Sequence, residues 1–211
     1  MNITTLDFQV LDWIQLHLQC AFLDWLMPKI TVLGNGGVIW IIIAVVLVCR
    51  RKTRCIGLTM GIGMLCGLAL GNGILKNLVQ RDRSCWIRSV ELLIAMPEDY
   101  SFPLGHTLSS FIAATVLFQY NRKAGIVAYA LAISIAFSRI YLYVHFPSDV
   151  LFAVAFGILI GILVNHAGKK DDAKNAKIPS IFFFEKYLRK YLIFSFKCII
   201  IKKVIIRHRT K

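Results

Sequence analysis

Residues 121–170 read NRKAGIVAYALAISIAFSRIYLYVHFPSDVLFAVAFGILIGILVNHAGKK. Two apolar runs, at about 124–143 and 147–167, lie on either side of a short polar turn, and basic residues flank both outer ends. A helix needs about 20 residues to cross the hydrocarbon core of a bilayer, and each run is long enough. The stretch therefore predicts two transmembrane helices joined by a polar turn on one side of a membrane.

The composition of the whole chain extends this prediction. Of the 211 residues, 57% are hydrophobic and 17% are charged, and the mean hydropathy is +0.66. These values exclude a disordered chain and disfavour a soluble cytosolic enzyme or a nucleic-acid-binding protein. Four more apolar stretches precede the pair, at about 8–33, 35–49, 55–80 and 104–120. The sequence thus predicts an all-α, polytopic membrane protein, a bundle of six transmembrane helices.

The first of these stretches leaves an alternative open. Pro28 interrupts residues 8–33, and Gly34-Asn35-Gly36-Gly37 follows directly. Such breaks are also typical of an interfacial helix followed by a shorter crossing.

Positive charge is concentrated at the C-terminal end. Residues 167–211 carry a net charge of +10 out of +14 for the chain. We therefore divide the chain into a membrane-embedded domain, 1–167, and a basic amphipathic tail, 168–211. The mixture of aromatic, aliphatic and basic residues in the tail predicts a cytoplasmic anchor on the anionic inner leaflet.

The basic loops predict the orientation of the bundle. Lys and Arg cluster at 50–54, at 122–123 and in the tail, and short basic loops stay in the cytoplasm. Six spans then place both termini in the cytoplasm. The connections at 81–103 and 139–147 face outward.

Three polar groups interrupt the apolar pattern at the outward ends of spans. In the first, Lys76 and Arg83 are seven residues apart, so a continuous helix would turn both to one site. The alternative is that Lys76 only extends toward the interface. In the second, Ser101-Phe-Pro-Leu-Gly105-His106 precedes a predicted helix, whose first amides could bind an anion. The alternative there is an ordinary turn with an interfacial His106.

The third group is the polar turn itself, with Ser138, Arg139, His145 and Asp149. Asp149 follows His145 by four residues and could hold the imidazole in one tautomer, leaving the other nitrogen for a substrate. The alternative is a structural ion pair between Arg139 and Asp149.

The predicted topology places all three groups on one side of the membrane. Cations, imidazoles and one carboxylate would meet there, and guanidinium and ammonium groups match the oxygens of a phosphate. The chain lacks a Cys/His cluster or a His-Glu-x-x-His spacing for a metal. We therefore expect phosphate chemistry that needs neither a metal nor another cofactor.

The same residues resemble the signature of the type 2 phosphatidic acid phosphatase family, K-x6-R-P, P-S-G-H and S-R-x5-H-x3-D. The third motif is complete at Ser138, Arg139, His145 and Asp149. The first departs from the pattern at Ser84, which stands where the family has Pro, and the second at Leu104, which stands where the family has Ser. Within the family, the short chain and Leu78-Val-Gln-Arg-Asp-Arg83 look most like bacterial undecaprenyl-diphosphatases.

The resemblance implies a role for each matching residue. His145 would attack phosphorus and form a phosphohistidine, Asp149 would orient it, and His106 would protonate the leaving oxygen and then activate water. The resemblance also implies a set of phosphate-binding residues: Lys76, Arg83, Arg139, Ser138 and the amide of Gly105. Ser84 would alter only loop stiffness. Leu104 would remove a donor from the phosphate pocket and place an apolar group near it, so we expect a slower enzyme.

The leading hypothesis is hydrolysis of undecaprenyl diphosphate at the outer face of a bacterial plasma membrane. The first alternative keeps the mechanism with phosphatidylglycerophosphate or phosphatidate as substrate. A second, motivated by Leu104, is a lipid-phosphate-binding protein with weakened catalysis. Expected partners are therefore polyprenyl or glycerophospholipid phosphates and the membrane itself.

Overall fold

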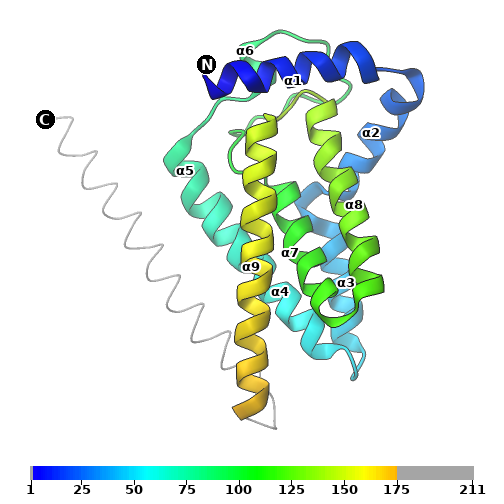
Figure 1. Ribbon diagram of the computed structural model, residues 1–211, viewed down its shortest axis with the longest axis vertical. Coiled ribbons are helices and arrows are strands. Elements are labelled where there is room, and N and C mark those ends of the chain that lie inside the picture. Colours follow the sequence, from blue (N-terminus) through cyan, green and yellow to red (C-terminus); the bar gives the residue numbers. More distant parts are fainter. Residues whose placement is uncertain (1, 175–211) are drawn as a thin grey trace, which may run out of the picture. The chain divides into compact units, whose positions relative to one another are not determined.

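The computed structural model describes residues 2–174, with side chains up to 168, and every regular element in that range is a helix. The predicted all-α class is therefore confirmed for the described residues. The predicted tail, 168–211, lies outside them beyond Lys174. The elements, labelled in Figure 1, are α1 (Ile3–Leu18), α2 (Ala21–Leu33), the 3₁₀ turn η1 (Asn35–Gly37), α3 (Val38–Cys49), α4 (Arg54–Leu68), the π-helical η2 (Ala69–Leu75), α5 (Lys76–Val79), α6 (Ser84–Ile87), α7 (Gly105–Tyr120), α8 (Arg122–Tyr141) and α9 (Pro147–Lys174).

Three described segments are long and apolar enough to cross a membrane: Arg54–Ile87, Arg122–Tyr141 and Pro147–Gly168. A fourth is added if α2 and the helical stretch Asn35–Cys49, which meet at a bend of 44°, form one broken span. Glycine makes this bend possible, because Gly36 and Gly37 have φ values of 58° and 69° that other residues rarely adopt.

The predicted stretch 35–49 corresponds to η1 and α3, but the predicted stretch 8–33 differs from the structure. Helix α1 ends at Leu18, extended backbone follows at Gln19 and Cys20, and α2 then begins at Ala21. Figure 1 shows α1 lying across one end of the helices rather than along them. The stretch 8–33 therefore forms two helices instead of one, which agrees with the two-helix alternative; that α1 lies at the membrane interface stays a prediction.

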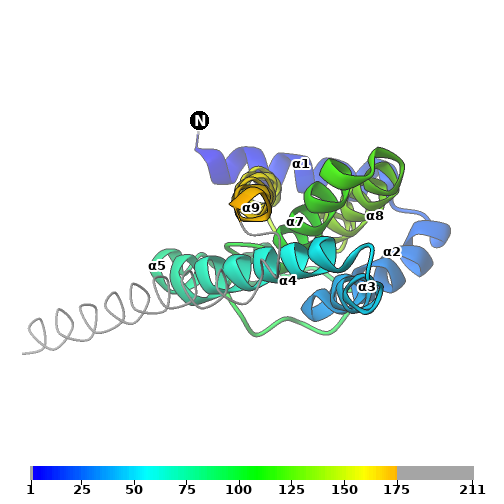
Figure 2. The same cartoon turned by 90° about the horizontal axis from the view of Figure 1, so that it is seen from below.

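Helix α7 lies at the centre of the bundle. Figure 2 shows α7 between α4, α8 and α9. Four residues of its middle turns, Ile112, Ala113, Ala114 and Val116, belong to the main hydrophobic core. Glycines on the flanking helices allow the close approach. A Cβ at Gly67 would lie 2.5 Å from Ile112, and one at Gly161 would lie 2.6 Å from Thr115. Close packing through small residues is the usual way for helices to associate in a membrane.

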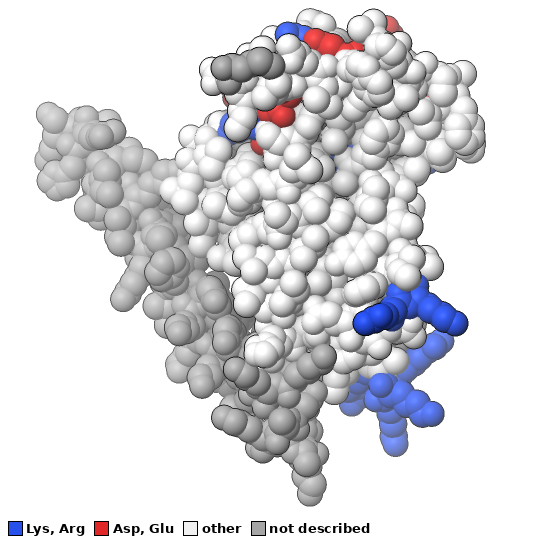
Figure 3. Space-filling model, in the orientation of Figure 1, with Lys and Arg blue, Asp and Glu red and all other residues white. Residues whose placement is uncertain are grey.

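Charged groups separate to the two ends of the bundle. The predicted basic loops 50–54 and 122–123 follow α3 and α7 and lie at one end, where Figure 3 shows a group of Lys and Arg. The other end carries α1 and both signs of charge, and the surface between is free of charge on the visible face (Figure 3).

Candidate active site

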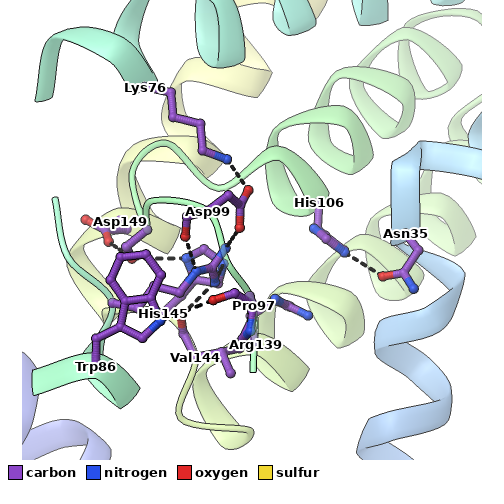
Figure 4. Close-up of polar contacts among 12 residues, drawn as sticks. Asn35, Lys76, Trp86, Pro97, Asp99, His106, Arg139, Val144, His145 and Asp149 are labelled. Carbon is purple, nitrogen blue, oxygen red and sulfur yellow. Dashed lines mark hydrogen bonds and ion pairs between the residues drawn. The ribbon is translucent and has the colours of Figure 1, made fainter. Parts of the chain in front are cut away.

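The polar residues predicted as a site meet at the end of the bundle that carries α1. They come from the ends of helices α5, α7, α8 and α9 and from the irregular segments between them (Figure 4). Helix α4 leads into this region through the seven-residue π-helical stretch η2, which ends just before Lys76. Short π-helical stretches are uncommon in proteins, but those that occur often lie at functional sites.

The helix that carries Lys76 does not continue to Arg83. Gln80 adopts a left-handed conformation with φ 46° and ends α5, and Arg83 lies on extended backbone before α6. The two cations nevertheless meet, because both form ion pairs with the carboxylate of Asp99. The predicted convergence of Lys76 and Arg83 is correct, and the continuous helix behind it is wrong.

His145 lies in the turn between α8 and α9 and is 2% exposed. Its Nε2 is 2.7 Å from Nη1 of Arg83, and its Nδ1 is 3.1 Å from Oγ of Ser101. A guanidinium group can only donate, so Nε2 accepts this bond and Nδ1 carries the proton. His145 therefore donates from Nδ1 to Ser101, and the single lone pair of Nε2 accepts from Arg83, a bond that must open before Nε2 can attack another atom.

Ser101 continues this chain to Asp149. Its hydroxyl donates to Oδ2 of Asp149 at 2.5 Å, and all three side chains are buried. Asp149 therefore reaches the imidazole through Ser101 and not directly as predicted, and its effect on the tautomer stays a prediction. The alternative of an Arg139–Asp149 pair is wrong, because the carboxylate pairs with Arg81 instead.

The surroundings of His145 also determine its charge. Burial is the main cause, and the positive charges of Arg83 and Arg139 add to it, so the pKa of His145 lies well below its ordinary value. The imidazole is therefore neutral at physiological pH, as a nitrogen nucleophile must be.

Asp99 lies between the two cations that precede it in the chain. Oδ2 contacts Lys76 and Oδ1 contacts Arg83, while the backbone oxygen of Asp99 accepts a 2.6 Å bond from Nε of Arg83. Partial burial of Asp99 acts to raise the pKa of the carboxyl, but the hydrogen bonds and charges of Lys76 and Arg83 outweigh it and lower that pKa. Asp99 is therefore ionised.

Arg139 is the third predicted phosphate-binding cation and has a different environment. It is 4% exposed, and Nη1 donates to Oγ1 of Thr31 at 2.8 Å. Its Nε is buried without a hydrogen-bond partner, and Arg139 forms no ion pair within residues 2–168. A buried guanidinium with donors to spare is suited to an anion.

His106 and Gly105 begin helix α7, as predicted. Nε2 of His106 is 2.8 Å from Oδ1 of Asn35, which lies in the break between α2 and α3 (Figure 4). Since an amide oxygen only accepts, Nε2 carries a proton, and Nδ1 is the nitrogen that can take up or release a proton. The break fits closely here, because a Cβ at Gly34 would lie 3.0 Å from the His106 ring.

Three other sequence expectations change in detail. Ser138 donates its hydroxyl to the carbonyl of Ile135 at 2.7 Å, within its own helix, and is not brought into the polar cluster. Leu104 is 1% exposed, and its side chain packs in the main hydrophobic core. Ser84 does more than alter loop stiffness, because its hydroxyl donates to the carbonyl of Tyr143 at 2.8 Å and so supports the turn that carries His145.

A further set of polar residues was not predicted from the sequence. Arg81 pairs with Asp149 and also with Asp7 of α1, at 2.7 Å for the latter. Asp7 additionally accepts bonds from the backbone nitrogen and hydroxyl of Ser148, at 2.9 and 2.6 Å. The sequence did contain one indication of this role, because Asp7 is an acidic residue in an otherwise apolar stretch. Ser101, Asp99 and Asn35 lie in segments without periodicity and gave none.

The contacts of α1 place it relative to the site. Asp7 contacts residues of the site, and Asp12 pairs with Arg88 in the same connection. Helix α1 therefore lies at the site end of the bundle, whereas the sequence prediction put the N-terminus and the site on opposite sides of the membrane; the side on which each lies stays a prediction.

Known proteins are similar to this chain in both sequence and fold. Residues 52–172 match the family model of the PAP2 superfamily. The chain is 32% identical over 146 residues to an undecaprenyl-diphosphatase of Sulfolobus acidocaldarius, covering 69% of this chain and 70% of that protein. It is 30% identical over 143 residues to the undecaprenyl-diphosphatase BcrC of Bacillus subtilis, covering 68% and 74% respectively.

A solved structure agrees with the fold. The PAP2-type phosphatidylglycerolphosphate phosphatase of Bacillus subtilis superimposes with a TM-score of 0.65 at 26% identity, over 80% of this chain and 87% of that one. The family match covers more than half of the chain and includes all three polar groups of the site. The chain therefore belongs to the PAP2 superfamily and is a membrane phosphatase of that family.

Proposed function

We propose that the protein hydrolyses undecaprenyl diphosphate to undecaprenyl phosphate and inorganic phosphate, at the outer face of a bacterial plasma membrane. The observation that carries this proposal is His145, a buried neutral imidazole whose Nε2 lone pair lies beside Arg83 while Nδ1 is held through Ser101 by Asp149. The undecaprenyl-diphosphatases among the relatives support the choice of substrate.

The first half of the reaction transfers the terminal phosphoryl group to the enzyme. Nε2 of His145 attacks the terminal phosphorus, a P–N bond forms, and the P–O bond to undecaprenyl phosphate breaks. His106 enters this step protonated on both nitrogens: Nε2–H stays bonded to Asn35, and the Nδ1 proton passes to the departing oxygen, which leaves His106 neutral. The phosphorylated imidazole ring gains positive charge, which the Ser101–Asp149 pair stabilises through the Nδ1 proton.

The second half releases phosphate. His106 accepts a proton from a water molecule, the water oxygen attacks phosphorus, and the P–N bond returns its electron pair to Nε2 of His145. Lys76, Arg83, Arg139 and the amide at Gly105 neutralise the charge on the phosphoryl oxygens in both steps. Such positioned charges supply most of the catalysis in phosphoryl transfer.

Phosphate release from the purified protein in nonionic detergent tests the proposal. Undecaprenyl diphosphate should release phosphate with EDTA present, and His145→Asn should lower the rate by a factor on the order of 10⁴ or more, because no nucleophile remains. Activity of the His145→Asn variant near the wild-type level would refute the phosphohistidine. Full loss of activity in EDTA, restored by a divalent metal, would refute the metal-independent mechanism.

A second substrate has a specific observation in its favour. The phosphatase that superimposes on this chain is named for phosphatidylglycerophosphate. Its terminal phosphate would meet the same residues. Parallel measurement of kcat/KM for undecaprenyl diphosphate, phosphatidylglycerophosphate and phosphatidate separates these substrates, and a higher value for either glycerolipid would replace the polyprenyl assignment.

A further inference from the structure

Asp99 places a negative charge where the site needs positive charge for a phosphate. Its two carboxylate oxygens contact Lys76 and Arg83 separately, as two oxygens of a phosphate would. Figure 4 shows the carboxylate between Lys76 and the cluster around His145. The Arg83 side chain is 3% exposed, so few other positions are open to an anion that binds this guanidinium.

Arg139 lies in the same site, but no carboxylate occupies its hydrogen-bond donors. It is buried, forms no ion pair with any residue in 2–168, and has an unpartnered Nε. Of the three cations, two are therefore held by Asp99 and one keeps donors for a ligand. The site can attract an anion through Arg139, but the anion must displace Asp99 to reach Lys76 and Arg83.

Displacement of Asp99 is structurally inexpensive. Its side chain is 57% exposed, and it lies in the connection between α6 and α7, which has no regular helix. Water can solvate the carboxylate once it leaves the cations, so the main cost is the loss of two ion pairs at the edge of the site.

We infer that Asp99 is a specificity-determining residue that selects terminal phosphates over the phosphodiesters of ordinary membrane lipids. A phosphodiester carries one negative charge, the same as Asp99, so replacing the carboxylate gains no charge interaction. A terminal phosphate carries about 1.5–2 negative charges at neutral pH and gains from the exchange. Bulk phospholipids greatly outnumber any lipid diphosphate in a membrane, and the carboxylate keeps them from occupying the cations.

This inference rests on the proposed function, in that the ligand is the phosphate end of a lipid. The test compares Asp99→Asn with Glu98→Gln in the full chain, purified in nonionic detergent. Glu98 is the adjacent residue, is exposed and forms no ion pair in the described part of the chain, so its substitution removes the same charge from the same loop. Asp99→Ser serves as a second variant, and thermal unfolding confirms that each protein is folded.

Two measurements test the inference: the affinity for inorganic phosphate, and the competition by a phosphodiester lipid. Calorimetric titration with inorganic phosphate should show Kd falling by at least about threefold in both Asp99 variants, roughly the strength of two ion pairs near a surface. In micelles with increasing phosphatidylglycerol, the apparent KM should rise for the Asp99 variants and stay level for the wild type and Glu98→Gln.

The outcomes are distinct. Unchanged or weaker phosphate binding in both Asp99 variants would overturn the inference, since Asp99 would then only orient Lys76 and Arg83. Phosphatidylglycerol inhibiting wild type and Asp99 variants equally would overturn it too. Phosphate titration needs no turnover, so an absence of undecaprenyl diphosphate hydrolysis would count against the proposed function while the effect of Asp99 is still measured.

Discussion

The chain of hydrogen bonds from His145 through Ser101 to Asp149 depends on a single hydroxyl. Ser101 is fully buried, and it both accepts from the imidazole and donates to the carboxylate. Without it, Nδ1 of His145 has no partner, and the positive charge of a phosphohistidine is no longer coupled to Asp149.

Ser101→Ala should therefore lower kcat by about 10–100-fold with little change in KM, because the phosphate-binding cations are untouched. Ser101→Thr keeps the hydroxyl and should retain most of the kcat that Ser101→Ala loses. Steady-state kinetics of both variants check this. An increase in KM at constant kcat would instead give Ser101 a role in binding.

Among individual residues, the sequence singled out the cations and the imidazole proposed to bind or attack phosphate more readily than the residues that hold them in place. Lys76, Arg83, Arg139 and His145 stand out because charged or imidazole groups next to apolar spans are costly without a function. Asp99 and Ser101 are ordinary loop residues by type. Their roles arise only when the connection between α6 and α7 folds back against the turn after α8.

At the scale of elements, α1 lies across the site end of the bundle and connects two of its segments. Its Asp7 is 4% exposed and binds Arg81 and Ser148 at the start of α9, and Arg81 in turn holds Asp149. The helix thus connects the segment after α5 to α9, the helix that carries Asp149. Removing a partner from a buried ion pair leaves an uncompensated charge.

Asp7→Asn should lower the unfolding free energy by about 2–3 kcal/mol and reduce kcat, because Arg81 and Ser148 lose a charged acceptor. Asp12→Asn is the matched control on the same helix. Asp12 pairs with Arg88 with both side chains about half exposed, and exposed pairs contribute about 0–1 kcal/mol. Asp12 also accepts a 2.8 Å bond from the hydroxyl of Tyr143, which the amide oxygen of Asn can still accept. Thermal unfolding and kinetics should separate the two variants, and equal effects would mean that α1 is held by its apolar contacts alone.

Uninterrupted apolar stretches of the sequence predicted the helices well, and an interrupted stretch predicted them less well. The predicted spans 104–120, 124–143 and 147–167 correspond to α7, α8 and α9. The stretches 35–49 and 55–80 likewise correspond to the helical segments 35–49 and 54–79, but extended backbone at Gln19 and Cys20 divides the stretch 8–33 into two helices. Hydrophobicity alone does not distinguish a helix that crosses the membrane from one that lies along its surface.

At the scale of the whole molecule, the ends of the bundle differ in charge and in chemistry. The site and α1 share one end, and the basic loops 50–54 and 122–123 share the other. Short basic loops remain on the cytoplasmic side, so this division predicts that both the site and the N-terminal helix face outward. An outward site would act on diphosphates in the outer leaflet.

Labelling of single cysteines in intact cells tests this orientation. Asn2 precedes α1 and Arg51 lies between α3 and α4, and both are exposed. In a chain with its native cysteines replaced by serine, a membrane-impermeant maleimide should label Asn2→Cys from outside and label Arg51→Cys only after permeabilisation. The reverse pattern would place the site in the cytoplasm. Labelling of both positions from the same side would contradict the separation of α1 from the basic loops, because at least one crossing must lie between them.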